Sequence, residues 1–220
     1  MLNLKDIVYH PPASPQPILK SITLELGFQQ LGIIIGPSGS GKTTLLEILA
    51  GLTEQTRGKI LWSGKEITSS ELQQISGLVF QFPERHFCGG NILEELRLGH
   101  LEITREEIEI ALEEVGLQNI ILSTSPHNIS GGQQRRLALA VQLIRQPNLL
   151  LLDEPTAGLD WSMHKQLINL VFKLKRHWTL VIVSHDPSEL LLIADKCWKI
   201  NEGRLEQVDV ELQKKIYVKN

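Results

Sequence analysis

The sequence has few cysteines and no strong excess of charge of either sign. Its 220 residues include two cysteines, Cys88 and Cys197, which are too far apart to build a disulfide framework or a zinc knuckle, so we expect both to be reduced and structural. Lys and Arg number 22 against 25 Asp and Glu, which gives a net charge of −3. Such a chain has no global positive field to attract nucleic acid or anionic lipid, so any anion site must be local.

Long apolar runs are also absent. No uncharged run approaches the roughly 18 residues that a bilayer-spanning helix needs, and the first residues do not have the pattern of a secretion signal. We therefore expect a chain that is not a membrane protein by itself and that works on the cytosolic side. Its 42% hydrophobic and 21% charged residues are typical of a globular protein, which excludes disorder and collagen, and its length fits one domain spanning residues 1–220.

Short strands alternate with helices along most of the chain. Residues 2–9 and 18–26 are β-like and flank a proline-rich loop, which predicts an antiparallel hairpin at a sheet edge. Helix formers dominate residues 88–146, which predicts a helical subdomain inserted there. Further strands are predicted at 31–35, 78–80, 149–152, 179–183 and 197–200, and further helices at 42–50 (closed by Gly51), 162–175 and 187–194. This alternation predicts an α/β protein with a mostly parallel sheet.

A glycine-rich turn after the strand at 31–35 carries the first functional motif. Residues 36–43 fit GxxxxGK[ST], in which successive backbone N–H groups cradle phosphates, Lys42 reaches the β- and γ-phosphates and the Thr43 hydroxyl binds Mg²⁺. The expected nucleotide-binding residues of this segment are Gly36, Pro37, Ser38, Gly39, Ser40, Gly41, Lys42, Thr43 and Thr44. The dinucleotide fingerprint GxGxxG does not fit, because the glycines fall at 36, 39 and 41.

A second motif consists of an apolar strand, 149–152, that ends in two carboxylates. Asp153 is expected to hold Mg²⁺ through its hydration shell, and Glu154 to polarise a water for attack on the γ-phosphate as general base. Taken alone, an Asp-Glu pair after a strand more often begins a capped helix. Together with a matched phosphate loop, it predicts the second half of a nucleotide site.

Residues 128–134, Asn-Ile-Ser-Gly-Gly-Gln-Gln, resemble the LSGGQ signature of ATP-binding cassette (ABC) ATPases and, as in that family, lie just ahead of the Asp-Glu strand. The resemblance extends over nearly the whole chain, with six motifs in family order: the phosphate loop at 36–43, Gln81, the signature at 130–134, LLLLDEP at 149–155, a D-loop-like run at 157–160, and His185. It implies the P-loop NTPase ABC ATPase fold, with a mostly parallel sheet core, an N-terminal antiparallel β-subdomain and a helical signature subdomain.

The resemblance implies a role for the signature that a single chain does not explain. Ser130, Gly131 and Gly132 at the start of a helix form an anion site, yet the chain already has a phosphate loop. In the family, two domains pack head to tail, so that each ATP lies between the phosphate loop of one subunit and the signature of the other. We therefore expect an ATP-dependent dimer in which Ser130, Gly131, Gly132 and Gln133 contact the partner's nucleotide.

The resemblance also implies roles for single residues. Gln81 would be a Mg²⁺ or water ligand and a sensor of the site, and His185 would contact the γ-phosphate. The implied catalytic residues are then Lys42, Gln81, Glu154 and His185, and the implied Mg²⁺ ligands are Thr43, Gln81 and Asp153. Asp160 would act across the dimer interface, although it would equally serve as a helix N-cap. Tyr9 is the candidate to stack on adenine, although simple alignment of the first strand places the family's aromatic nearer Pro11.

The run Gln-Phe-Pro-Glu at residues 81–84 is similar to the Gln-loop of ATPases in energy-coupling-factor importers, which carry vitamins or transition-metal ions. This implies an ATP-hydrolysing subunit, with ATP and Mg²⁺ as cofactors, at the cytoplasmic side of the membrane. It would close as a homo- or heterodimer to power integral membrane transporter subunits, with no nucleic-acid partner. Two alternatives stay open: a soluble mechanochemical ABC ATPase of DNA maintenance or translation, and an ABC ATPase paired with membrane proteins for signalling.

Overall fold

The computed structural model describes residues 1–100 and 102–217. Its strands are β1 (Leu2–Tyr9), β2 (Leu19–Leu26), β3 (Leu31–Ile35), β4 (Arg57–Trp62), β5 (Lys65–Glu66), β6 (Ser76–Val79), β7 (Leu149–Asp153), β8 (Thr179–Ser184), β9 (Lys196–Asn201) and β10 (Arg204–Val208). Its α-helices are α1 (Lys42–Leu49), α2 (Ser69–Ile75), α3 (Ile92–Arg97), α4 (Arg105–Glu114), α5 (Gly131–Leu143), α6 (Trp161–Leu174) and α7 (Val210–Tyr217). Short 3₁₀ helices are η1 (Pro83–Arg85), η2 (Pro126–Asn128) and η3 (Leu190–Leu192).

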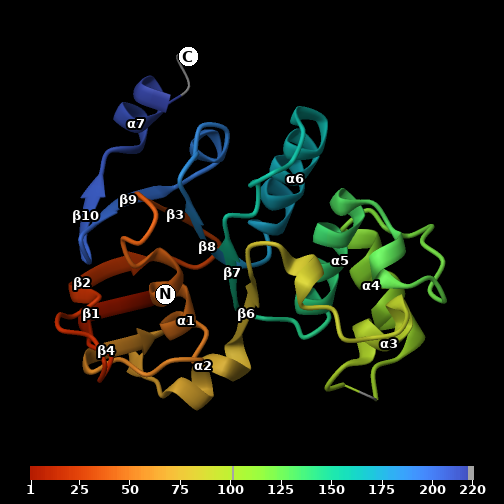
Figure 1. Cartoon of the computed structure of the whole chain (residues 1–220), viewed down its shortest axis with the longest axis horizontal. Coiled ribbons are helices and arrows are strands. Elements are labelled where there is room, and N and C mark those ends of the chain that lie inside the picture. Colours follow the sequence, from red (N-terminus) through yellow and green to blue (C-terminus); the bar gives the residue numbers. More distant parts are fainter. Residues whose placement is uncertain (101, 218–220) are drawn as a thin grey trace.

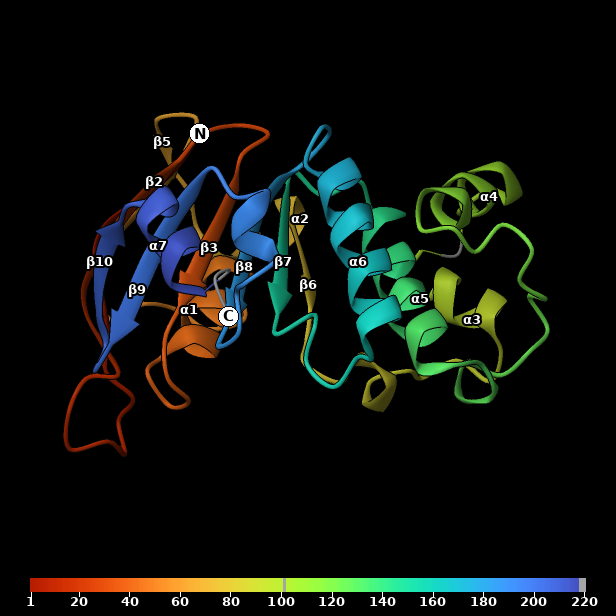
Figure 2. The same ribbon diagram turned by 90° about the horizontal axis from the view of Figure 1, so that it is seen from above.

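The strands form two sheets (Figure 1). The six-stranded sheet has the order β10-β9-β3-β8-β7-β6, in which β9, β3, β8, β7 and β6 run parallel and β10 alone pairs antiparallel. The four-stranded sheet, β2-β1-β4-β5, is antiparallel. Helices α3, α4 and α5 lie together at the far side of α6 from the sheets (Figure 2). This is the α/β architecture that the sequence predicts, with a mostly parallel core and an antiparallel N-terminal sheet.

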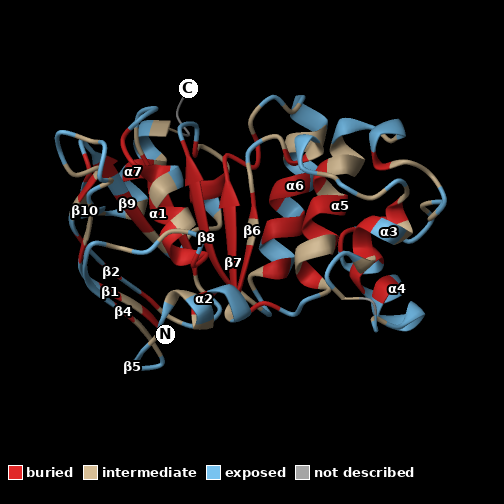
Figure 3. Ribbon diagram, turned by 60° about the horizontal axis from the view of Figure 1, so that its bottom comes forward, coloured by how far each residue is buried: buried red, intermediate tan, exposed pale blue. Residues whose placement is uncertain are grey.

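The central strands of the larger sheet are buried on both faces (Figure 3). Along β7, Leu150 and Leu152 join the apolar cluster that includes residues of α3 to α6, whereas Leu149 and Leu151 join the cluster formed with α1 and the antiparallel sheet. All four leucines have no exposed surface. Truncating any one of them to alanine would cost about 2–5 kcal/mol of stability. The sheet therefore divides the core into two layers and leaves room for polar groups only at the strand ends.

Helix α1 begins and ends at glycines whose backbone is left-handed. Gly41 is the N-cap, with φ of 104°, and Gly51 follows the C-cap with φ of 69°. A Cβ on Gly51 would lie 2.1 Å from the Ser69 carbonyl oxygen, so no other residue fits at this end. The two glycines hold α1 at a fixed length directly behind the phosphate loop.

The structure differs from the sequence-based predictions at several elements. The helix predicted for 187–194 is wrong: only the 3₁₀ turn η3 forms there. The segment between β8 and β9 is short and closes mainly with i to i+3 hydrogen bonds such as Ile193 N to Leu190 O. The predicted hairpin, by contrast, is confirmed: β1 and β2 pair antiparallel, and β2 is an edge strand of the four-stranded sheet. Elements β4, β5, α2, β10 and α7 were not foreseen. Among the described residues, none of the helices has the length and apolar character to cross a bilayer.

The two cysteines have different environments. Cys197, on β9, has no exposed surface, and its burial raises the pKa of its thiol to about 11, whereas Cys88 is exposed. Cys197 therefore has a buried structural position, whereas Cys88, which we also expected to be structural, lies at the surface. Neither forms a disulfide.

A thiol reagent is expected to distinguish the two cysteines. The thiolate is the reactive species, and at pH 8 only about one Cys197 in a thousand would be ionised even if the reagent reached it. A colorimetric thiol titration of the native protein should therefore find one fast thiol, and two after unfolding in guanidinium chloride. The variant Cys88→Ser should show no fast thiol in its native state. Two thiols reacting at similar rates in the native protein would contradict this picture of β9.

Candidate active site

Four parallel strands of the six-stranded sheet deliver polar residues to one edge. The glycine-rich loop follows β3, Gln81 comes two residues after β6, Asp153 and Glu154 lie at the end of β7, and His185 directly follows β8. In the sheet, Ile35 pairs with Ser184 and Asp153 with Val183, so these strand ends lie in register. Ligands of open parallel sheets collect at this carboxyl edge.

The phosphate loop folds back on its own lysine. The Lys42 ammonium donates to the carbonyl oxygens of Gly36, at 2.8 Å, and Pro37, at 3.0 Å, and its side chain is almost fully buried. A Cβ on Gly36 would lie 2.3 Å from the Ile200 carbonyl oxygen, so the loop is packed against β9 and needs glycine there. The loop leads into the N-terminus of α1, whose free N–H groups and dipole favour an anion.

Thr43 and Asp153 place oxygen ligands beside this loop. The Thr43 hydroxyl donates to Asp153 Oδ2 at 2.8 Å, and Asp153 is 5% exposed. Burial raises the pKa of Asp153, an effect that the Thr43 hydrogen bond opposes. Burial and the charge of Asp153 likewise raise the pKa of Glu47, one helical turn beyond Thr43. A hard cation with oxygen ligands would relieve this concentration of negative charge, so the residues fit Mg²⁺.

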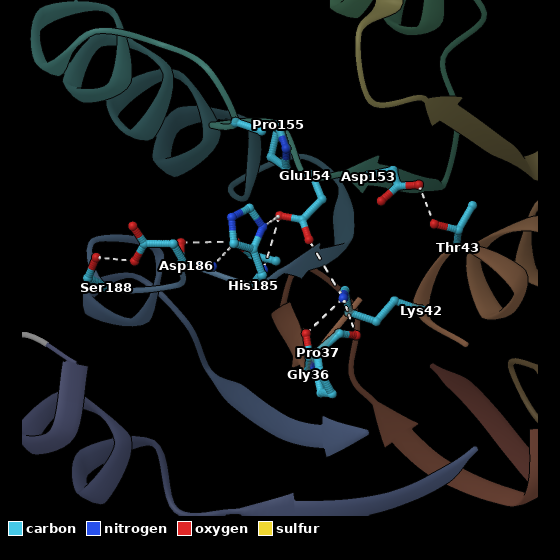
Figure 4. A network of polar contacts seen from close by, with 12 residues as sticks. Gly36, Pro37, Lys42, Thr43, Asp153, Glu154, Pro155, His185, Asp186 and Ser188 are labelled. Atoms are coloured by element: carbon cyan, nitrogen blue, oxygen red, sulfur yellow. Dashed lines mark hydrogen bonds and ion pairs between the residues drawn. The ribbon is translucent and has the colours of Figure 1, made fainter. Parts of the chain in front are cut away.

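Glu154 lies between a lysine and a histidine (Figure 4). Its Oε1 is 3.7 Å from Lys42 Nζ, and its Oε2 accepts the backbone N–H of His185 at 3.0 Å and lies 2.7 Å from His185 Nδ1. The residue is 7% exposed and has a left-handed backbone with φ of 45°. Such strain in a non-glycine residue persists only where its surroundings hold it, and it is common at active sites. The arrangement can orient a carboxylate that accepts a proton from water.

These groups share one cavity of about 540 Å³. Its lining is Ile18, Ser38, Gly39, Gly41, Lys42, Thr43, Thr44, Gln81, Asp153, Glu154 and His185. The structure thus brings together the expected catalytic residues, the expected Mg²⁺ ligands and much of the expected phosphate loop. Gly36, Pro37 and Ser40 support the loop from behind and do not line the cavity.

The signature residues lie elsewhere. Ser130 caps α5 in a reciprocal capping box: its hydroxyl accepts the Gln133 N–H at 3.3 Å, and Gln133 Oε1 accepts the Ser130 N–H at 2.9 Å. Ser130 and Gly132 line a separate cavity of about 220 Å³ together with Asp160. The N–H groups of Gly131 and Gly132, in the first turn of α5, have no acceptor within the helix. A Cβ on Gly131 would meet no neighbouring atom, so this helix end is open.

Asp160 acts as a helix cap in this chain. Its carboxylate accepts the Met163 N–H at 2.9 Å at the start of α6. Met163 in turn packs against Gly132, because a Cβ there would lie 3.1 Å from its sulfur. The first turn of α6 and the signature are therefore in direct contact.

Tyr9 does not line the cavity. It is partly buried against the apolar cluster of the antiparallel sheet, opposite Leu19. Ile18, whose N–H donates to the Tyr9 carbonyl oxygen at 2.8 Å, contributes the apolar wall instead. Stacking of Tyr9 on adenine stays a prediction. Sequence reasoning missed Ile18, and its position directly before β2, within the stretch predicted as strand, was the available signal.

Sequence reasoning also missed Arg135. It lies in the first half of α5, and its side chain is 8% exposed and bonded to the segment after Glu154. An arginine within a helix ordinarily points to solvent, so the sequence pattern alone offered no signal.

Known proteins with similar sequences identify the family. The family model described as ABC transporter matches residues 19–157. The chain is 39% identical over 218 residues to "ABC transporter I family member 11, chloroplastic" of Arabidopsis thaliana, covering 92% of this chain and 78% of the relative. It is 36% identical to "Energy-coupling factor transporter ATP-binding protein EcfA2" of Symbiobacterium thermophilum, covering 86% of this chain and 70% of the relative.

A solved structure shows the same fold. The protein cbiO1 of Clostridium perfringens, described as part of the ABC transporter complex cbiONQ, superposes with a TM-score of 0.89 at 26% identity, covering 99% of this chain and 92% of that one. The resemblance that the six sequence motifs indicated is confirmed by these matches. The chain belongs to the ABC transporter family, as one of its ATP-binding, ATP-hydrolysing subunits.

Proposed function

We propose that this chain binds and hydrolyses Mg²⁺-ATP in the cavity at the carboxyl edge of the sheet, and that ATP closes a dimer that powers a membrane importer. One observation carries the proposal: the buried Glu154 carboxylate faces Lys42 and His185 in the cavity that also contains Thr43 and Asp153. Phosphoryl transfer to water requires a general base, a cationic group that binds phosphate, and oxygen ligands for a hard cation, and this cavity contains all three.

Each residue has a distinct task in this proposal. Lys42 exchanges the carbonyl oxygens of Gly36 and Pro37 for phosphate oxygens, while Thr43 and Asp153 hold the cation, with Gln81 beside them. Bound Mg²⁺ supplies neutralisation of the charge that develops on the phosphates. Glu154 accepts the proton of the attacking water, and His185 keeps the Glu154 carboxylate oriented and lies where it can contact the γ-phosphate.

The location of the signature supports a dimer. Ser130 and Gly132 line a different cavity from the phosphate loop, so this end of α5 does not complete the chain's own site. In a head-to-tail dimer, the open helix end with Gly131 and Gly132 would bind the nucleotide of the partner. A two-fold arrangement would make two such composite sites at once. The signature residues Ser130 to Gln133 and Asp160 then act between subunits.

The relatives favour a membrane-coupled role. One bears the name of an energy-coupling-factor transporter ATP-binding protein, and one is part of an ABC transporter complex. We infer that residues 1–220 form one ABC ATPase domain, with residues 88–146 as its helical subdomain, and that it binds integral membrane subunits at the cytoplasmic face. The vitamin or metal ion that is carried would be set by those subunits.

Replacing the proposed base should separate binding from hydrolysis. Glu154→Gln keeps the size of the side chain but cannot accept the proton of water, so we expect hydrolysis to fall about 10²- to 10³-fold while ATP affinity is retained. The variant should also accumulate as a dimer with ATP, which size-exclusion chromatography with light scattering would detect.

The matched control is Glu206→Gln, an exposed carboxylate on β10 that is not part of the cavity. It should hydrolyse ATP at the wild-type rate. If Glu154→Gln also retained that rate, Glu154 would not be the base.

Removing the lysine should weaken nucleotide binding itself. In Lys42→Ala the almost buried ammonium that now binds two loop carbonyls is lost, and with it the charge that faces the phosphates. We expect the Kd for ATP to rise at least about tenfold, measured by titration calorimetry in the presence of Mg²⁺. Lys199→Ala, at an exposed position on β9, should leave the Kd unchanged. An unchanged Kd in Lys42→Ala would remove the proposed phosphate contact.

The membrane-coupled role can be tested by purification of the tagged chain from its native cells in mild detergent. We expect integral membrane proteins in near-stoichiometric amounts, identified by mass spectrometry, and stimulation of the ATPase rate when they are present. Recovery of soluble or nucleic-acid-bound partners alone would contradict this role and would favour a mechanochemical ATPase.

A further inference from the structure

A buried arginine connects the signature helix to the turn that follows Glu154. Arg135 is 8% exposed, and its Nη1 donates to the Pro155 carbonyl oxygen at 2.6 Å while its Nη2 donates to that of Ala157. Among the described residues, no carboxylate lies within ion-pair distance of this guanidinium. Two backbone carbonyls of one short turn are therefore the groups that compensate a nearly buried charge, and the planar fork fits both at once.

The same turn determines the position of Glu154. The Ala157 N–H donates to the Glu154 carbonyl oxygen at 3.1 Å, which closes a tight turn around Pro155. Glu154 itself has the left-handed backbone, at φ of 45°, that places its carboxylate between Lys42 and His185. This conformation is costly for a glutamate, so an external contact must hold it. The Glu154 N–H donates to the Val183 carbonyl oxygen at 3.0 Å, and Arg135, which does not line the cavity, binds the carbonyls of the turn that follows.

A third element also reaches this arginine. Glu84 belongs to η1, which begins two residues after Gln81, and Pro83 of η1 lines one small cavity together with Arg135 and Pro155. Burial lowers the pKa of Arg135, and the charge of Glu84 opposes this effect. Phe82, between Gln81 and Pro83, has a left-handed backbone with φ of 58°, an unfavourable conformation before proline. A displacement of η1 would thus change the charge next to the guanidinium.

We propose that Arg135 is a positioning residue of the ATPase. Its two hydrogen bonds fix the orientation of the Glu154 carboxylate, which therefore depends on the position of the signature helix and of the segment after Gln81. The inference rests on the proposed function, in which Glu154 is the base and the signature binds the partner's nucleotide. In that dimer, a displacement of the start of α5 would be transmitted to the Glu154 turn of the same chain through the Arg135 side chain. Arg135 does not touch the nucleotide.

The test compares Arg135→Lys with Arg145→Lys. Lysine keeps the positive charge but presents one ammonium, which cannot hold the Pro155 and Ala157 carbonyls in the fixed geometry of a guanidinium. Arg145 is the matched control: it lies just beyond the end of α5, is exposed, and lines neither the cavity of Glu154 nor that of the signature. Steady-state ATPase kinetics, ATP binding and hydrogen–deuterium exchange of residues 154–160 are measured on both variants and the wild type.

For Arg135→Lys we expect kcat to fall about 10- to 100-fold, with KM and the Kd for ATP within about twofold, because the phosphate loop is untouched and only the base is misplaced. Residues 154–160 should exchange faster, while α5 keeps its protection. Arg145→Lys should change neither kcat nor the exchange of the turn. If Arg135→Lys kept the wild-type kcat, or lowered it no more than Arg145→Lys does, the inference would be overturned.

Separate controls distinguish unfolding of the variant and failure of the proposed function from failure of this inference. If Arg135→Lys unfolds at the assay temperature, Arg135→Gln is measured at 10 °C, where its amide donates to one carbonyl alone and the same loss of kcat is expected. A wild-type kcat in that variant would overturn the inference as well. Failure of the proposed function would be recognised independently, by Glu154→Gln hydrolysing ATP at the wild-type rate.

Discussion

Burial of the parallel strands on both faces is the constraint on which the rest of the structure depends. Successive residues of β3, β7 and β8 point into two different apolar layers, so these strands carry polar side chains only at their first or last residues. Because the strands run in the same direction and in register, their ends meet at one edge. The phosphate loop, Asp153, Glu154 and His185 are close together for this reason, although up to 149 residues separate them in the chain, counted from Gly36 to His185.

The charged side chains at this edge are balanced only when both a divalent cation and a phosphate chain are bound. Asp153 and Glu154 are almost fully buried, and Glu47 is close enough for its pKa to be raised by Asp153, whereas Lys42 is the cation among them. The carboxylates alone would repel a phosphate chain, and Lys42 with the α1 N-terminus alone would leave the carboxylates uncompensated. A divalent cation beside a phosphate chain satisfies both groups. The electrostatics thus favour Mg²⁺-ATP over either component.

The parts that could be predicted from the sequence are those set by covalent spacing or by strand direction. Lys42 and Thr43 are placed by the loop between β3 and α1, and Asp153, Gln81 and His185 follow strands whose parallel pairing the alternation of elements implied. The predictions that were wrong or missing concern features that depend on tertiary contacts. The helix predicted at 187–194 does not form, because the segment between β8 and β9 is short. The place of Ile18 in the cavity wall depends on where the preceding loop closes. Arg135 could not be found because its acceptors are backbone carbonyls, which no sequence pattern marks.

The chain contains two halves of a nucleotide site that do not face each other. Contacts between these halves therefore affect more than the stability of one chain. The phosphate loop half and the signature half line separate cavities, yet they are joined through the bonds of Arg135 to the Glu154 turn. In the proposed dimer, each chain gives its signature to one ATP and its base to the other. Contacts that would be ordinary packing in a monomer then connect two different nucleotides. Because interiors are close-packed, a shift of the signature helix would move the Glu154 turn with it, so the two sites cannot be aligned independently.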